Sequence, residues 1–152
     1  MLKKTLINNV IALPAYVVAT IAAGLVTFLL LEEYYEIFIG GIATLFYALC
    51  GFLLIPVKKL SFLSVVSVPV ALTIMFLICV PMGEEGMIYA FLIPIGISLA
   101  EIERRLGFYY PDNLWLVMVI LTHVLPALLF YLGMVLRKLI RSKKQSKALG
   151  GA

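Results

Sequence analysis

Four apolar runs that contain no Asp, Glu, Lys or Arg dominate this sequence: residues 5–31, 37–57, 60–81 and 114–136. A helix needs roughly 20 such residues to cross the hydrocarbon core of a bilayer, which is about 30 Å thick. A soluble chain of 152 residues that is 64% apolar could not bury that much apolar surface. The sequence therefore predicts an all-α integral membrane protein and excludes an ordinary soluble enzyme, a disordered chain and a disulfide scaffold.

A fifth apolar segment begins at Met87 and contains Pro94 and Gly96. It ends at Ala100, and its short length is typical of a re-entrant or interfacial helix rather than a span. If the helix continues through residues 101–106, it becomes long enough to cross. Length alone therefore leaves a five-span alternative open.

The distribution of charge favours four spans, because cytoplasmic loops carry the excess of Lys and Arg. With four crossings and a cytoplasmic N-terminus, 10 of the 12 basic residues lie inside and all 8 acidic residues lie outside. A fifth crossing would place the basic C-terminal segment outside. We therefore predict four transmembrane helices with both termini in the cytoplasm (N-in/C-in) and a short helix at about 87–106 in the last external loop.

Domain organisation follows from the same pattern. Residues 1–136 form a single transmembrane helical domain, and residues 137–152 form a basic cytoplasmic tail. Arg104 and Arg105 are the exceptions to the charge rule. Glu101 lies four residues before Arg105, a spacing at which oppositely charged side chains pair on a helix.

Small residues and prolines predict how the helices pack. Ala15, Ala19 and Ala23 recur every four residues in the first run, a spacing that lets membrane helices approach closely. Prolines remove backbone donors, so we expect kinks where they interrupt the apolar segments: Pro14, Pro69, Pro94 and Pro126. Kinked helices can surround a cavity, although proline is also simply common in membrane helices.

The predicted external side combines acidic and aromatic residues. One hypothesis is an anionic vestibule that attracts a cationic ligand, because clustered like charge raises the local concentration of such a ligand. Its candidate ligand-binding residues are Glu84, Glu85, Glu101, Glu103, Tyr109 and Asp112. The alternative is an ordinary interfacial belt of aromatics beside acids that are tolerated outside.

Polar residues within the spans are few. His123 lies near the middle of the last span, and serines recur through the third as Ser61, Ser64 and Ser67. These residues are candidates for a proton relay or a polar path. The competing interpretation is that they form hydrogen bonds between helices.

The basic tail matches the juxtamembrane pattern that contacts anionic lipid headgroups. The predicted headgroup residues are Arg137, Lys138, Arg141, Lys143 and Lys144. Membrane lipids are therefore expected partners, together with a membrane-protein partner or further copies of the chain. Nothing in the sequence indicates nucleic-acid binding.

Enzymatic chemistry is the weakest prediction. The chain has no HExxH, GxSxG or P-loop motif, and we expect no catalytic residues, no cofactor and no metal site. Cys50 and Cys79 lack a CxxC partner and are expected to be small buried hydrophobic side chains; a disulfide between them is disfavoured, and a redox role stays open. A membrane enzyme acting on lipid is the least favoured alternative.

The sequence thus predicts a non-enzymatic accessory, regulatory or immunity-type subunit with an acidic-aromatic external face. The alternative is a small transporter or channel that works as a homo-oligomer. The short loops and the charge bias suit a multi-pass protein of a bacterial inner or plasma membrane.

Overall fold

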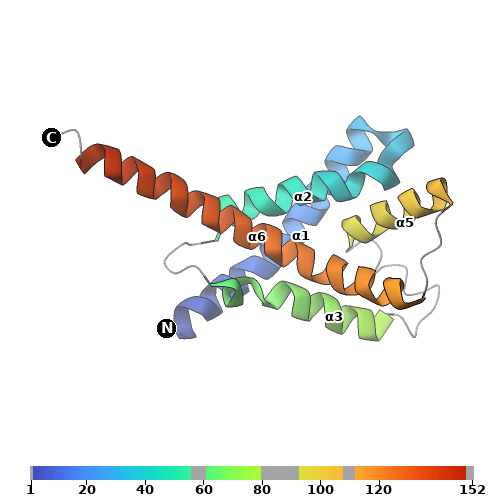
Figure 1. The fold of residues 1–152 in the computed structure, drawn as a ribbon, viewed down its shortest axis with the longest axis horizontal. Helices are drawn as coiled ribbons and strands as arrows, with labels where there is room; N and C mark the ends of the chain where they lie inside the picture. The colour runs from blue at the N-terminus through green and yellow to red at the C-terminus, as the bar shows by residue number, and fades with distance from the viewer. Residues whose placement is uncertain (1, 56–60, 80–92, 108–111, 150–152) are drawn as a thin grey trace.

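A computed structural model describes residues 2–55, 61–79, 93–107 and 112–149 of the chain, and within these ranges it contains helices and no strands (Figure 1). The elements, in chain order, are α1 (Leu2–Leu30), η1 (Glu32–Tyr34), α2 (Tyr35–Leu53), η2 (Phe62–Val65), α3 (Ser67–Cys79), α5 (Pro94–Leu106) and α6 (Asp112–Leu149), where η1 and η2 are 3₁₀ turns.

Three of these helical segments are long and apolar enough to cross a membrane: Thr5–Leu30, Glu32–Leu53 and Ile120–Lys143. The chain is therefore a membrane-embedded, all-α helical bundle. The third predicted span, 60–81, is described over residues 61–79. Its described part is the turn η2 followed by the 13-residue helix α3, which is shorter than a typical span. Four crossings and their orientation stay predictions.

The helices run in alternating directions along the bundle (Figure 1). α1 and α3 lead away from the end that holds both chain termini, and α2 and α6 lead back towards it. We call this end the terminal end. α5 lies at the opposite end, which we call the α5 end.

Of the four prolines at which kinks were predicted, two lie inside helices and two lie at helix starts. Pro14 and Pro126 lie within α1 and α6, as expected. Pro94 is the first residue of α5, and Pro69 lies in the first turn of α3, so the predicted kinks at these two positions are wrong. A proline is tolerated in the first turn because the missing N–H would have no partner within the helix there.

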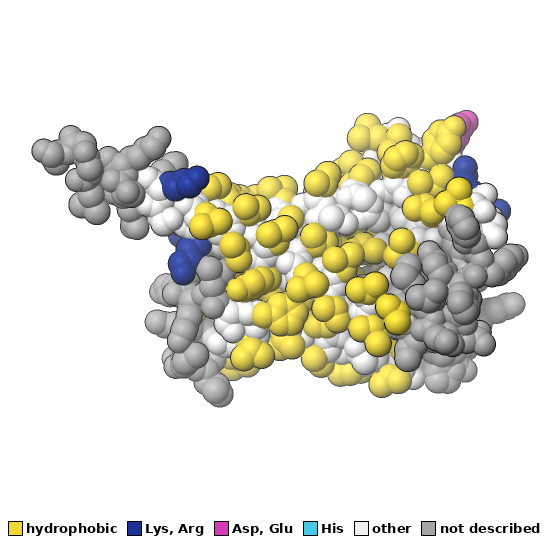
Figure 2. All heavy atoms as spheres, in the orientation of Figure 1, with side chains coloured by type: hydrophobic (Ala, Val, Ile, Leu, Met, Phe, Trp, Pro, Cys, Tyr) yellow, Lys and Arg dark blue, Asp and Glu magenta, His cyan; other side chains and the backbone are white. Residues whose placement is uncertain are grey.

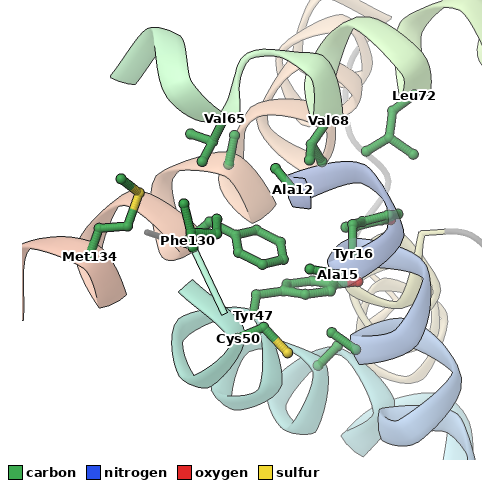
Figure 3. Packing of buried hydrophobic residues seen from close by; sticks show 14 of the residues in the cluster. Ala12, Ala15, Tyr16, Tyr47, Cys50, Val65, Val68, Leu72, Phe130 and Met134 are labelled. Atoms are coloured by element: carbon green, nitrogen blue, oxygen red, sulfur yellow. The ribbon is translucent and has the colours of Figure 1, made fainter. Parts of the chain in front are cut away.

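An aromatic stack joins α1, α2 and α6 at the centre of the bundle (Figure 3). The Tyr47 ring stacks on Tyr16 at 5.1 Å between centroids and on Phe130 at 5.8 Å. The Tyr47 hydroxyl is 3.0 Å from the Thr20 hydroxyl, which satisfies both groups in an apolar interior. This stack therefore joins three helices through side chains of the core.

The predicted small-residue face of α1 is confirmed. Ala15, Ala19 and Ala23 are buried, together with Ala12, and they pack towards the core cluster. Van der Waals packing of this kind replaces the hydrophobic driving force that membrane helices lack.

A second close crossing, between α2 and α6, depends on two glycines. A Cβ atom at Gly51 would lie 2.7 Å from the Cα of Phe130, and one at Gly133 would lie 2.7 Å from the backbone nitrogen of Phe52. Both distances are shorter than real Cβ contacts, so only glycine lets the two backbones approach this closely. Neither glycine was singled out by the sequence patterns above.

Asn9 of α1 fastens the start of α3. Its Oδ1 accepts the backbone N–H of Ser67 at 2.8 Å, and its backbone carbonyl accepts the Ser67 hydroxyl at 2.9 Å. Its Nδ2 donates to the carbonyl of Leu63 at 2.7 Å. Asn9 thus acts as an N-cap supplied by another helix, because it satisfies an N–H that α3 leaves without a partner.

We therefore expect Asn9→Ala to lower the free energy of unfolding by about 1–2 kcal/mol, the usual cost of losing an N-cap. Chemical unfolding in mixed micelles, followed by circular dichroism, measures this change. Thr73→Ala is the matched control, because the exposed Thr73 hydroxyl bonds the Pro69 carbonyl one turn back in its own helix, α3. An equal loss in both variants would contradict the capping role.

Candidate functional site

Charged side chains gather at the α5 end. Glu32, Glu33 and Glu36 are exposed on η1 and the first turn of α2. The ring of Tyr34 meets that of Phe38 edge to face at 6.4 Å. This part of the surface has the acidic and aromatic character that the sequence predicts for one side of the membrane.

α5 is held tightly against α2. The backbone N–H of Gly40 donates to the Ser98 hydroxyl at 2.7 Å, and a Cβ at Gly40 would lie only 3.0 Å from the Cα of Ile95. Glycine at position 40 therefore lets α5 pack directly on the α2 backbone. Gly107 ends α5 in the left-handed conformation, with φ of 67°, which favours glycine.

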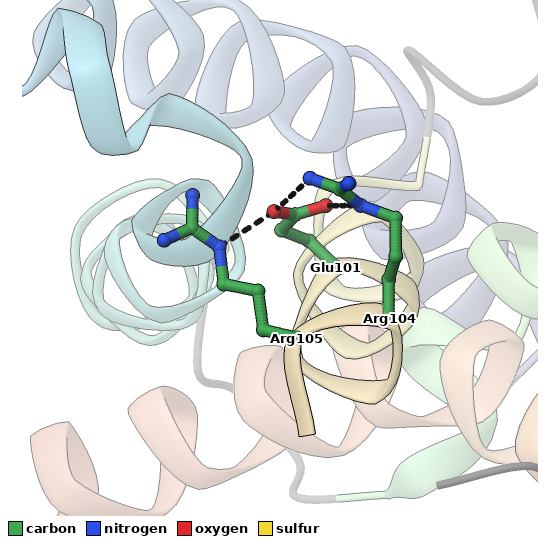
Figure 4. Close-up of polar contacts among 3 residues, drawn as sticks. All are labelled: Glu101, Arg104 and Arg105. Carbon is green, nitrogen blue, oxygen red and sulfur yellow. Dashed lines mark hydrogen bonds and ion pairs between the residues drawn. The ribbon is translucent and has the colours of Figure 1, made fainter. Parts of the chain in front are cut away.

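Three side chains of α5 form an ion-pair cluster (Figure 4). Arg104 donates to both carboxylate oxygens of Glu101 at 2.7 Å, and Arg105 donates to one of them at 2.6 Å. The Glu101 side chain is only 5% exposed, whereas those of Arg104 and Arg105 are 73% and 48% exposed. The predicted pair between Glu101 and Arg105 is confirmed. The second pair, with Arg104, was not predicted, although its spacing of three residues could have indicated it.

The two arginines control the ionisation of this carboxyl. Their hydrogen bonds, that of Arg104 before that of Arg105, lower the pKa of Glu101 from 4.5 to about 2. In turn, the hydrogen bond with Glu101 raises the pKa of Arg104, with a smaller contribution from the charge of Glu36 on α2. The cluster is therefore fully ionised near neutral pH, and Glu101 neutralises one of the two arginines.

This shift predicts an acid-dependent contribution to stability. Because the folded protein holds the pKa of Glu101 at about 2 and the ordinary value is 4.5, the ion pairs stabilise the fold above about pH 4.5. The contribution is lost as the pH falls towards about 2. We expect the difference in thermal midpoint between wild type and Glu101→Gln to be constant near neutral pH and to shrink over this range. A difference that does not vary with pH would contradict the assignment.

The other predicted ligand residues cannot be assembled into one site. Glu84, Glu85 and Tyr109 lie outside the described residues. Glu103 is on α5 and Asp112 is the first residue of α6, but only their backbones are described. Of the six, Glu101 alone has a described side chain, and its oxygens already accept hydrogen bonds from Arg104 and Arg105. The cation-binding vestibule stays a prediction.

The predicted polar path is divided among separate elements. Ser61 precedes η2, Ser64 is buried in η2, and Ser67 is the first residue of α3, so the three serines do not form a stripe on one helix. Ser67 bonds Asn9 as described above. These contacts are those of a packed helix junction.

His123 is a residue of α6, and its side chain contacts α3. Its side chain is buried, and its ring meets the edge of Phe76 at 5.6 Å between centroids, with the two planes perpendicular. Its Nδ1 is 3.5 Å from the hydroxyl of Thr122. The histidine thus has aromatic and polar neighbours on two helices, as expected for an interhelical contact.

The basic residues at the terminal end have different environments. Arg137 reaches from α6 to the C-terminal end of α2 and donates to the carbonyls of Leu53, the last residue of α2, and of Ile55, just beyond it, at 3.2 Å each. It thereby places a positive charge at the C-terminal end of α2, where the helix dipole favours one. Lys138, Arg141 and Lys143 are exposed, and the side chain of Lys144 lies outside the described part.

Both cysteines are free thiols. Cys50 is buried in α2 and Cys79 is partly buried at the end of α3. Within the described ranges, no three His, Cys, Asp or Glu side chains gather as a metal-binding group.

Comparison with known protein families, with characterised proteins and with solved structures finds no match to this chain. The functional argument therefore rests on the residues themselves, which belong to an all-α, membrane-embedded bundle with an ion-pair cluster at the α5 end and exposed basic residues at the terminal end.

Proposed function

We propose that this protein is a non-enzymatic accessory or regulatory subunit, of the kind that includes immunity factors, and that it recognises a partner at the α5 end. The observation that carries the proposal is the ion-pair cluster of Glu101, Arg104 and Arg105. It fixes two largely exposed guanidinium groups on a helix that is itself fastened to α2 through Gly40 and Ser98. Preorganised side chains lose less entropy on binding, so such a surface suits recognition.

The proposal includes an orientation. Four crossings with both termini in the cytoplasm agree with the alternating helix directions in Figure 1. They also put the exposed Lys138 and Arg141 inside and Glu32 and Glu33 outside, in line with the positive-inside rule. The proposed location is a bacterial inner or plasma membrane. A cysteine introduced at the exposed Leu106 should be labelled from the external side, and labelling only from the cytoplasm would contradict four spans.

Hydrogen bonds in the bundle interior support recognition over transport. The buried Thr20 and Tyr47 hydroxyls bond each other, and Thr27 and Thr44 each bond a carbonyl one turn back in their own helix. These groups are committed to structure rather than to a polar path. The exposed ionic groups of the α5 end remain open to another molecule.

Native mass spectrometry after purification in mild detergent tests the proposal. We expect a foreign subunit to co-purify with the wild type and its yield to fall about 30-fold in Arg104→Gln/Arg105→Gln, because each of the two lost charge pairs at the interface costs roughly 1 kcal/mol. Lys138→Gln/Lys143→Gln is the matched control at the terminal end and should retain the subunit. Purification as a lone monomer, unchanged by either variant, would contradict the accessory role.

A small transporter or channel, working as a homo-oligomer, is the second candidate. It is favoured by α5, whose first turn begins among the buried residues Ile93, Pro94 and Ile95. Helices that begin within the bundle surround substrate sites in several transporter folds. A homo-oligomer that supports flux in proteoliposomes would favour this candidate. If His123→Ala and Ser64→Leu both leave that flux unchanged, these residues do not line the path.

A further inference from the structure

The C-terminal part of α6 projects beyond the other helices at the terminal end (Figure 1). α6 has 38 residues, so it is about 57 Å long, nearly twice the thickness of the hydrocarbon core. The predicted boundary between a span and a tail at residue 136 is not a break in the helix. Lys, Arg, Leu and Gln all favour helix, and proline and glycine are missing from residues 137–149.

The basic residues of this projection begin where the apolar surface ends. In Figure 2, apolar side chains cover the middle of the visible face and Lys and Arg side chains lie towards its two ends. Leu136, Leu139 and Ile140 are still exposed on α6, directly beside the exposed Lys138 and Arg141. Apolar and basic side chains that alternate within one turn are typical of the level at which hydrocarbon meets phosphate, because long basic side chains extend from it to the headgroups.

Arg137 does not belong to this exposed set. Its guanidinium bonds the carbonyls of Leu53 and Ile55, and it therefore fixes α6 against the end of α2. Lys138, Arg141 and Lys143 follow within two turns, and all three side chains are exposed.

We propose that Lys138 and Arg141, which are neighbours three residues apart on α6, form a docking surface for the phosphate groups of anionic phospholipids in the leaflet at the terminal end. Positive charge at the headgroup level complements an anionic lipid, and neighbouring apolar side chains contact its acyl chains. Arg137 contributes to helix packing and not to lipid binding. This assignment does not depend on the partner proposed for the α5 end.

The experiment compares lipid binding by the full chain in native mass spectrometry, with dioleoyl phosphatidylglycerol and dioleoyl phosphatidylcholine as probes. The wild type should retain phosphatidylglycerol preferentially. A basic residue near a membrane surface contributes about five-fold to such binding, so Lys138→Gln/Arg141→Gln should lower the preference by about 25-fold. Lys138→Arg/Arg141→Lys keeps both charges and should retain the preference.

Two controls separate this surface from a general effect of charge. Arg104→Gln/Arg105→Gln removes the same number of positive charges at the α5 end and should leave the preference unchanged. Arg137→Gln should also leave it unchanged while lowering the thermal midpoint, because α2 loses its cap. Inorganic phosphate should not displace the bound lipid. An unaltered preference in Lys138→Gln/Arg141→Gln, an equal loss in Arg104→Gln/Arg105→Gln or displacement by phosphate alone would overturn the proposal.

Discussion

Phe130→Ala is expected to lower the free energy of unfolding by about 4 kcal/mol, the largest effect that we predict for a single side chain. Phe130 is fully buried on α6, and its ring stacks on Tyr47 of α2, which in turn stacks on Tyr16 of α1. Removing the ring leaves a cavity where three helices meet. Neighbouring side chains lose dispersion contacts there that lipid cannot replace.

Phe28→Ala is the matched control for this prediction. Phe28→Ala removes the same number of atoms, but the side chain of Phe28 is 55% exposed on α1. We expect a change within about 0.5 kcal/mol, as for most surface substitutions. Unfolding in mixed micelles, monitored by circular dichroism, measures both variants. A similar cost in both would show that the aromatic stack does not hold the bundle together.

Gly133→Ala is expected to destabilise the protein by about 3 kcal/mol, at the upper end of the usual cost of overpacking. A Cβ at position 133 would press on the backbone of α2 near Phe52, and one at Gly51 would press on the backbone of α6 near Phe130. Backbone cannot rotate away as a flexible side chain can, so the two helices must separate. We expect Gly51→Ala to have a similar effect, and the same unfolding measurement tests both variants.

Gly41→Ala is the control, because the same substitution on α2 meets nothing within 4 Å there. Alanine favours helix over glycine by about 1 kcal/mol, so this variant should gain stability rather than lose it. The sign of the change therefore distinguishes a close crossing from a general effect of glycine in a helix. Stabilisation by Gly133→Ala as well would contradict the crossing.

The apolar runs predicted the helical, membrane-embedded character of the chain because that character depends on composition and length. Contacts within one helix could also be predicted from the sequence, because they depend only on the spacing of residues along it. Glu101 and Arg105 are four residues apart, and that spacing alone brings their side chains together on any helix. The small face of Ala15, Ala19 and Ala23 follows the same periodicity.

The candidate site could be predicted less well from the sequence. Sequence patterns grouped Glu101 with other acids as a cation ligand, whereas its oxygens accept hydrogen bonds from Arg104 and Arg105. The serines of the third run were expected on one helix. Ser67 instead starts α3 because Asn9 caps it from α1, a partner 58 residues away. Nothing local in the sequence identifies such a partner.

Periodicity and charge thus determined which segments are helical and where most of the charges gather, because these properties depend on residues close together along the chain. Only the tertiary structure decided which glycines lie at the helix crossings and which arginine caps a neighbouring helix. Gly51 meets α6, Gly40 meets α5, and Arg137 reaches the carbonyls of Leu53 and Ile55. Each contact joins distant segments, and its geometry depends on how closely two backbones approach once the bundle has packed.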